Sequence, residues 1–187
     1  MQFIDLLLQI SDSLKIVAGS DYPAAVARAT ALLTTAVTSG NKILVFGNGG
    51  SAADAQHIAG ELLGRFKRDR APIGVVALGT NHAYLTAWSN DLSYDDVFAR
   101  ELEALGARGD VAWGISTSGN SGNVVRALER ARALGLHTIG LTGNGGGAAA
   151  QHCDVLIDVP LNDTPRIQEV HLITYHAICG ALEASTR

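Results

Sequence analysis

The sequence has 187 residues, of which 47% are hydrophobic and 17% are charged, and its formal net charge is −4 at pH 7. This length favours one domain, residues 1–187, with a substantial buried core. Without a long basic run the sequence gives no indication of nucleic-acid binding, and no apolar stretch reaches membrane-spanning length without charges or glycines. The mean hydropathy of +0.18 favours burial of some surface between subunits.

The first forty residues predict two helices. The apolar positions of residues 3–18 form a wide stripe, which indicates a helix with more than one apolar neighbour. A break precedes Pro23, a residue favoured near a helix start, and the second helix is predicted to reach about Ser39 and to end at Gly40. We expect this segment, residues 1–40, to pack in an oligomer against the same segment of another subunit.

From residue 43 onward, predicted strands alternate with predicted helices. Apolar runs predict strands at residues 43–46, 73–78, 111–115, 137–141 and 155–159. Helices are predicted after Ser51, at residues 81–88 and 94–105, from the 116–121 loop to Leu134, and at residues 164–184. This alternation is typical of an α/β fold with three layers, in which helices flank both faces of a five-stranded parallel sheet. Ligands bind such sheets beyond the carboxyl ends of the strands.

A glycine-rich turn, Gly47-Asn48-Gly49-Gly50-Ser51, follows the first strand. We predict that Ser51 caps the next helix, because serine is favoured at this position. Backbone N–H groups at a helix start, beside glycines that carry no side chain, let an anion or a sugar approach the main chain. The glycine spacing and the missing downstream acid do not fit a dinucleotide-binding fingerprint.

A hydroxyl-rich loop, Ser116-Thr117-Ser118-Gly119-Asn120-Ser121, joins the third strand to the following helix. Hydroxyl groups and the free N–H groups of a helix start suit a phosphate, which needs many donors around a small dianion. The loop lacks the lysine of a P-loop, which argues against hydrolysis of a nucleoside triphosphate. The alternative interpretation is an ordinary serine-capped turn.

His57 and Glu61 lie four residues apart on the helix after the glycine-rich turn. This spacing places an imidazole and a carboxylate on one face, within reach of one metal ion or one substrate atom. The alternative is a histidine with an ordinary surface or core role. On the last helix, Gln168 and His176 are eight residues apart and therefore share a face.

Other polar residues have simpler interpretations. On the last helix, the alternative to a functional role is a solvated ion pair for Arg166 and Glu169, and a surface or interface position for His171. The basic stretch at residues 65–70 is predicted to be a solvated helix end and loop.

The two cysteines and the amino terminus favour an intracellular location. Cys153 and Cys179 lie far apart in apolar surroundings, which predicts buried free thiols and not a disulfide. The first residues contain no basic region, and Asp5 interrupts the apolar run, so no signal peptide is predicted. A cytoplasmic protein is the resulting expectation.

Together and in this order, the motifs resemble the sugar isomerase (SIS) family and, within it, the phosphoheptose isomerases. The residues that carry the resemblance are Gly47–Ser51, His57-x-x-x-Glu61, Asn90-Asp91, Ser116–Ser121, Arg166-Ile167-Gln168-Glu169-x-His171 and His176. They cover nearly the whole chain. The resemblance implies one SIS domain with a five-stranded parallel sheet, a sugar-phosphate substrate, and a homotetramer with active sites built between subunits.

The resemblance also assigns roles to matching residues. It implies one zinc ion per subunit, with ligands at His57, Glu61, Gln168 and His176. It implies substrate contacts at Asn48, Gly49, Gly50, Ser51, Glu61, Asn90, Asp91, Ser116, Thr117, Ser118, Ser121 and Gln168. Glu61 and His176 match the family's acid/base pair.

The reaction implied by this resemblance is the conversion of sedoheptulose 7-phosphate to D-glycero-D-manno-heptose 7-phosphate through an enediol(ate). Such a reaction needs a base over one face of the sugar, a proton carrier for its oxygens, and a group that holds oxyanion charge. We predict that Glu61 abstracts the carbon-bound proton and that His176 moves protons at the other end, with zinc polarising the carbonyl or ordering its ligands. Because zinc weakens a carboxylate base, Glu61 is expected to change its coordination during turnover.

Three departures from the family pattern bear on the length and anomer of the sugar. They lie at residues 79–83, at residues 89–94 and at Pro165.

An alternative function is that of a non-catalytic tetrameric SIS scaffold that binds the replication initiator DnaA, but that branch lacks the residues matching Glu61 and His176. A regulator that senses sugar phosphates would carry an attached DNA-binding domain, for which 187 residues leave no length.

Overall fold

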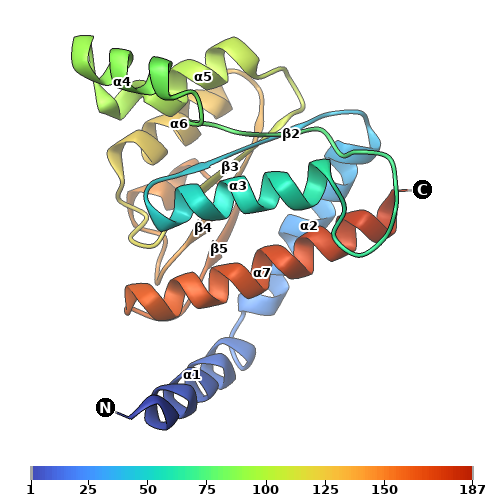
Figure 1. Cartoon of the computed structure of the whole chain (residues 1–187), viewed down its shortest axis with the longest axis vertical. Coiled ribbons are helices and arrows are strands. Elements are labelled where there is room, and N and C mark those ends of the chain that lie inside the picture. The colour runs from blue at the N-terminus through green and yellow to red at the C-terminus, as the bar shows by residue number, and fades with distance from the viewer. Residues whose placement is uncertain (1, 187) are drawn as a thin grey trace.

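The computed structural model describes residues 2–186 and consists of a central sheet with helices on both sides (Figure 1). The strands are β1 (Ile43–Gly47), β2 (Val75–Ala77), β3 (Val111–Ser116), β4 (His137–Thr142) and β5 (Val155–Asp158). The helices are α1 (Phe3–Ala18), α2 (Tyr22–Thr38), α3 (Gly50–Leu63), α4 (His82–Asp91), α5 (Val97–Leu105), α6 (Gly122–Ala133) and α7 (Thr164–Ser185). Two short 3₁₀ helices are η1 (Tyr94–Asp96) and η2 (Gly147–His152).

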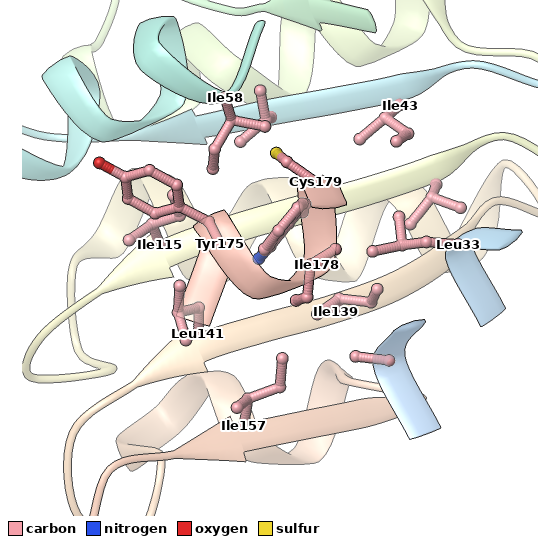
Figure 2. Close-up of a cluster of buried hydrophobic side chains, with 14 of the residues drawn as sticks. Leu33, Ile43, Ile58, Ile115, Ile139, Leu141, Ile157, Tyr175, Ile178 and Cys179 are labelled. Carbon is pink, nitrogen blue, oxygen red and sulfur yellow. The ribbon is translucent and has the colours of Figure 1, made fainter. Parts of the chain in front are cut away.

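All five strands are parallel, in the order β2-β1-β3-β4-β5. Successive residues of a strand point to opposite faces. Ile43 and Val45 join the core beneath α2, α3 and α7, whereas Leu44 and Phe46 join the core beneath α5 and α6. Figure 2 shows part of the first core, in which Ile178 of α7 lies over the sheet. The predicted three-layer fold with a five-stranded parallel sheet is therefore confirmed.

The strand order reverses between β1 and β3. From β1 the chain crosses to β2 at one edge of the sheet, whereas β4 and β5 are added on the far side of β3. In parallel sheets of this order, ligands bind at the carboxyl ends of the two strands where the connections diverge. Gly47 and Ile115 are paired at these ends, so the glycine-rich turn and the hydroxyl-rich loop leave the sheet side by side.

The prediction that Ser51 caps the helix after β1 is wrong. Helix α3 begins at Gly50, its N-cap is Gly49, and Ser51 is buried within the first turn. The φ angle of Gly49 is 55°, a conformation that glycine adopts without a steric cost. The chain therefore enters the helix earlier than the position of the serine indicated.

Several predicted boundaries also differ from the structure. The helix predicted at residues 81–88 extends to Asp91, and the one predicted at residues 94–105 divides into η1 and α5. The second strand is limited to Val75–Ala77, and η2 lies in a region for which the sequence predicts no helix. The predicted helices near the amino terminus and at residues 164–184 agree with α1, α2 and α7.

Helix α1 projects from the rest of the chain (Figure 1). Val17 is its buried residue. Large apolar side chains of the same helix are exposed: Phe3, Ile4, Leu7, Leu8 and Ile16. In contrast, α2 packs against α7 and β5 and buries residues such as Leu33. The wide apolar stripe predicted from the sequence is thus only partly covered among the described residues.

Cys153 and Cys179 are free thiols, as predicted; Cys179 is fully buried, whereas Cys153 is only partly buried. None of the helices within residues 2–186 is both long enough and apolar enough to cross a membrane.

Candidate active site

Two regions contain most of the predicted functional residues. The first, called here the strand-end site, comprises Asn48–Ser51 and Ser116–Ser121. In it, the side-chain amides of Asn48 and Asn123 bond each other, with Asn48 Nδ2 donating to Asn123 Oδ1 at 2.8 Å and the reverse bond at 2.9 Å. Tyr94 also donates its hydroxyl proton to Asn48 Oδ1 at 2.8 Å. These bonds join the end of β1 to the first turn of α6 and to η1.

The hydroxyl-rich loop is held by the main chain of its neighbours. Gly143 N–H donates to the carbonyl of Thr117, and Ala149 N–H donates to the carbonyl of Gly119. Asn120 Oδ1 accepts from Ala148 N–H at 2.9 Å, which ties the loop to η2. The loop is therefore fixed mainly by its contacts with the neighbouring main chain, and the Thr117 hydroxyl has no hydrogen bond among residues 2–186, which leaves it available to a ligand.

The hydroxyls of the loop border the start of α6. Ser116 and Ser121 lie within hydrogen-bond distance of each other, with 3.0 Å between their Oγ atoms. Ser118 is exposed and Thr117 is partly exposed. Ser121 is the N-cap of α6, but its side chain does not cap the helix. Unbonded N–H groups at this helix start, next to several hydroxyls, suit an anion such as a phosphate.

The second region, called here the helix-pair cluster, comprises His57 and Glu61 of α3 and His176 of α7. One ligand atom from each residue lies within 4.8 Å of the others. His57 Nε2 is 3.0 Å from Glu61 Oε1, and the rings of His57 and His176 are 5.1 Å apart. The side chains of His57 and Glu61 are 41% and 22% exposed, so ions and small molecules can reach them.

Two imidazoles and one carboxylate form the set of ligands that catalytic zinc sites use, with a further position open for water or substrate. The cluster therefore fits a zinc ion by the chemistry of its donors. His176 also lines a pocket of about 430 Å³ together with Phe66 and Lys67. A ligand in this pocket would contact the cluster.

Tyr175 and Asp54 support the cluster, and the sequence did not single them out. Tyr175 donates its hydroxyl proton to Asp54 Oδ1 at 3.3 Å and lies 3.0 Å from His57 Nδ1. Burial, followed by the charge of Asp54, raises the pKa of Tyr175, and burial also raises the pKa of Asp54. Asp54, His57 and Glu61 follow the i, i+3, i+7 spacing of one helical face, which is the signal that could have identified Asp54.

The basic stretch after α3 is not entirely solvated, contrary to the prediction. Arg70 is buried and donates to the backbone carbonyls of Glu61 and Leu62, each at 2.8 Å. Glu183 of α7 is 4% exposed and accepts from the N–H groups of Phe66 and Lys67. The loop is thereby held against α7, where the ring of Phe66 lies 5.6 Å from that of His176.

Three predicted site residues lie outside these clusters. Gln168 packs against Gly50 at the start of α3, and eight residues, a rise of about 12 Å, separate it from His176 along α7. Asn90 and Asp91 are exposed in the last turn of α4, where Asn90 donates to Asp91 Oδ1 at 2.8 Å. Within residues 2–186 of one chain, three of the four predicted metal ligands lie together, namely His57, Glu61 and His176, and Gln168 lies apart from them.

His171 is fully buried, so its predicted place at a surface is wrong for the single chain. Its Nε2 lies 3.1 Å from the carbonyl oxygen of Thr142, at the carboxyl end of β4. Burial lowers the pKa of His171 to about 4. The Arg166–Glu169 ion pair is present at 2.7 Å, although Arg166 is mostly buried.

The parallel sheet, the loops at its carboxyl edge and the helix-pair cluster define an SIS-domain protein. A family model described as "SIS domain" matches residues 9–143. The phosphoheptose isomerase of Crocosphaera subtropica is 58% identical over 146 residues, which are 78% of this chain and 74% of that protein. The phosphoheptose isomerase of Aliarcobacter butzleri is 53% identical over 156 residues, 83% and 82% of the two chains.

Solved structures agree with these relatives. The phosphoheptose isomerase GmhA from Neisseria gonorrhoeae matches with a TM-score of 0.91 and 38% identity, over 97% of both chains. A phosphoheptose isomerase from Francisella tularensis matches with a TM-score of 0.92 and 32% identity, over 98% of this chain and 100% of that one. The chain belongs to the phosphoheptose isomerase family of SIS-domain proteins.

Proposed function

We propose that this chain is a sugar-phosphate isomerase that interconverts sedoheptulose 7-phosphate and D-glycero-D-manno-heptose 7-phosphate. The observation that carries the proposal is the convergence of His57, Glu61 and His176 in a chain of this family. His57 lies six residues after Ser51 on α3, a rise of about 9 Å. That separation is comparable with the length of an extended seven-carbon sugar phosphate.

The mechanism divides the substrate between the two regions. The hydroxyls and N–H groups of the strand-end site bind the phosphate, which directs the carbonyl end of the sugar toward Glu61. Glu61 removes a proton from C1 of the ketose, and the carbonyl oxygen at C2 takes up a proton, which gives the enediol. Loss of the O1 proton and return of a proton to C2 then form the aldose, with His176 moving protons between the two oxygens.

A zinc ion is part of this proposal. His57, Glu61 and His176 would hold it, and their nitrogen and oxygen donors support that choice of metal. When bound, zinc would supply Lewis-acid polarisation of the sugar oxygens. Gln168 remains a predicted fourth ligand. It is not part of the helix-pair cluster, because in the single chain it packs against Gly50.

We also propose a homotetramer with active sites between subunits. The exposed apolar residues of α1, and Leu172 and Ile173 of α7, support burial of these faces in an oligomer. The separation of Asn90, Asp91 and Gln168 from the helix-pair cluster is consistent with their contributing to sites shared between copies. Sedimentation equilibrium tests this proposal, and a monomer at micromolar concentration would contradict it.

The non-catalytic scaffold that binds DnaA is not favoured. Its known branch lacks the residues that match Glu61 and His176, and both are present here in one cluster. The curated relatives named above are isomerases.

The test is turnover of sedoheptulose 7-phosphate by purified protein of measured metal content. We expect Glu61→Gln to lower kcat by about 10³-fold, within the range that a positioned general base contributes, and to leave the oligomer intact. Glu129→Gln, at an exposed position of α6, is the matched control and should retain the wild-type rate. Retained activity in Glu61→Gln would overturn the role of Glu61, and no turnover by the assembled, zinc-loaded wild type would overturn the proposed function.

A further inference from the structure

The hydroxyl group of Tyr175 lies between Asp54 and His57. Its oxygen is 3.3 Å from Asp54 Oδ1 and 3.0 Å from His57 Nδ1. The tyrosine is fully buried, and Figure 2 shows its hydroxyl oxygen at the edge of the apolar cluster, pointing away from Ile178. Because packing fixes the ring, the hydroxyl has little freedom to leave these two partners.

The chemistry of the three groups fixes the direction of their hydrogen bonds. A phenol has one proton, and an ionised carboxylate can only accept, so the proton of Tyr175 is directed to Asp54. The phenol oxygen must then accept from His57, which requires the proton of the neutral imidazole to be on Nδ1. His57 Nε2 consequently carries a lone pair.

This lone pair is directed at Glu61. His57 Nε2 and Glu61 Oε1 are 3.0 Å apart, and in this tautomer both atoms are acceptors. Two acceptors at that distance repel, a cost that the hydrogen bonds made through Tyr175 offset in the metal-free protein and that a cation close to both atoms removes. The arrangement thus prepares a cation site, and the second imidazole of His176 stands beside it.

We propose that Tyr175 is a positioning residue that fixes His57 as the Nδ1–H tautomer and so keeps Nε2 free to bind a metal ion. Such indirect support, a hydrogen-bond partner behind a histidine ligand, sets both the ring orientation and the basicity of the coordinating nitrogen. The statement about the metal rests on the proposed function, whereas the statement about the tautomer does not.

The first experiment measures the tautomer directly in the metal-free protein. Long-range ¹H–¹⁵N spectra distinguish the two neutral imidazole tautomers, and a pH of about 9 is well above the ordinary imidazole pKa of about 6.5. We expect wild-type His57 to be the Nδ1–H form. In Tyr175→Phe, which keeps the ring and removes the hydroxyl, Glu61 Oε1 is the remaining acceptor, so the proton should move to Nε2.

Tyr22→Phe is the matched control. Tyr22 is also buried, and its hydroxyl bonds Thr174 Oγ1 at 2.7 Å, one residue before Tyr175 on α7. This variant loses a buried tyrosine hydroxyl of the same kind, but that hydroxyl does not contact His57. We expect it to keep the Nδ1–H form. Any other form in the wild type, an unchanged form in Tyr175→Phe, or the same change in Tyr22→Phe would overturn the proposal.

The second experiment measures zinc affinity by competition with a chelator. Loss of a hydrogen-bond partner behind a metal ligand typically weakens binding about 10- to 100-fold, and we expect a loss in this range for Tyr175→Phe but not for Tyr22→Phe. Equal affinities would overturn the role of Tyr175 in metal binding. If the wild type fails to turn over the sugar phosphate while the tautomer and affinity results hold, the proposed function fails and the positioning role stands.

Discussion

The strand-end site and the helix-pair cluster are held in different ways. Thr117 and Gly119 are fixed by backbone bonds from the loop after β4 and from η2. In the helix-pair cluster, side chains hold one another: Asp54, Tyr175 and His57 form a chain of hydrogen bonds across two helices. Replacing a side chain that makes no hydrogen bond in the strand-end site, such as Thr117, should therefore change ligand binding alone, whereas replacing a side chain of the helix-pair cluster should disturb its neighbours.

The largest expected effect comes from disrupting the backbone of the strand-end site. Gly119 has a φ of 64°, and a Cβ atom there would collide with the carbonyl oxygen of Gly146. We expect Gly119→Ala to lower the free energy of unfolding by about 3 kcal/mol, from positive φ and overpacking together. Gly145→Ala is the control, because its φ is 76° and open space surrounds the position, so only about 1 kcal/mol should be lost. Urea unfolding measures both, and equal losses would show that the loop is not held as described.

The next effect is a loss of folding stability in acid, which arises at His171 near the carboxyl end of β4. Burial lowers the pKa of His171 to about 4, from an ordinary value of 6.5. Between these values the unfolded chain binds a proton that the folded chain does not, so stability should fall by up to about 3 kcal/mol as the pH drops from 6.5 to 4. His171→Gln, which retains a donor for the Thr142 carbonyl, should flatten this slope in melting curves recorded from pH 4 to 7. An unchanged slope would contradict the assignment.

A smaller effect separates substrate binding from catalysis. The Thr117 hydroxyl makes no hydrogen bond among residues 2–186 and is predicted to contact the phosphate. Thr117→Val keeps the shape and should raise KM about 10-fold, equivalent to about 1.4 kcal/mol, while kcat changes little. Zinc affinity should stay at the wild-type value, in contrast to Tyr175→Phe. A fall in kcat at constant KM would assign Thr117 to the chemical step.

The smallest effect is expected at Glu183, on the side of the helix-pair cluster. Burial alone would raise the pKa of Glu183, but the N–H groups of Arg68, Phe66 and Lys67, with the charge of Arg70, lower it below its usual 4.5. Its contribution to stability is present above pH 4.5 and is lost as the pH falls through the lowered value. The difference in melting temperature between wild type and Glu183→Gln should therefore shrink below about pH 4.5. A difference that is constant with pH would contradict this account.

Local patterns predicted the fold well because each strand is a short apolar run between turn residues. The strand-end site could also be predicted, since its residues follow one another in sequence and parallel strands end at one edge. Ser51 shows the limit of such reasoning: serine is a good N-cap, but the chain turns at Gly49, whose φ is positive.

The helix-pair cluster could be predicted only in part. His57 and Glu61 share a helical face, so their proximity follows from spacing. The meeting of His57 with Tyr175, 118 residues away, depends on how α3 packs against α7, which no local pattern reports. For the same reason Arg70 was expected to be solvated, although Glu183 of a distant helix buries it.

The most direct test of the account follows the substrate proton. In D₂O, the enediol mechanism with Glu61 as base predicts that NMR will show deuterium at C2 of the aldose formed from sedoheptulose 7-phosphate. Glu61→Gln should slow both conversion and deuterium uptake by about 10³-fold, whereas Glu129→Gln should retain the wild-type rate of both. Conversion and deuterium uptake at the wild-type rate in Glu61→Gln would contradict the central claim that Glu61 transfers the carbon-bound proton.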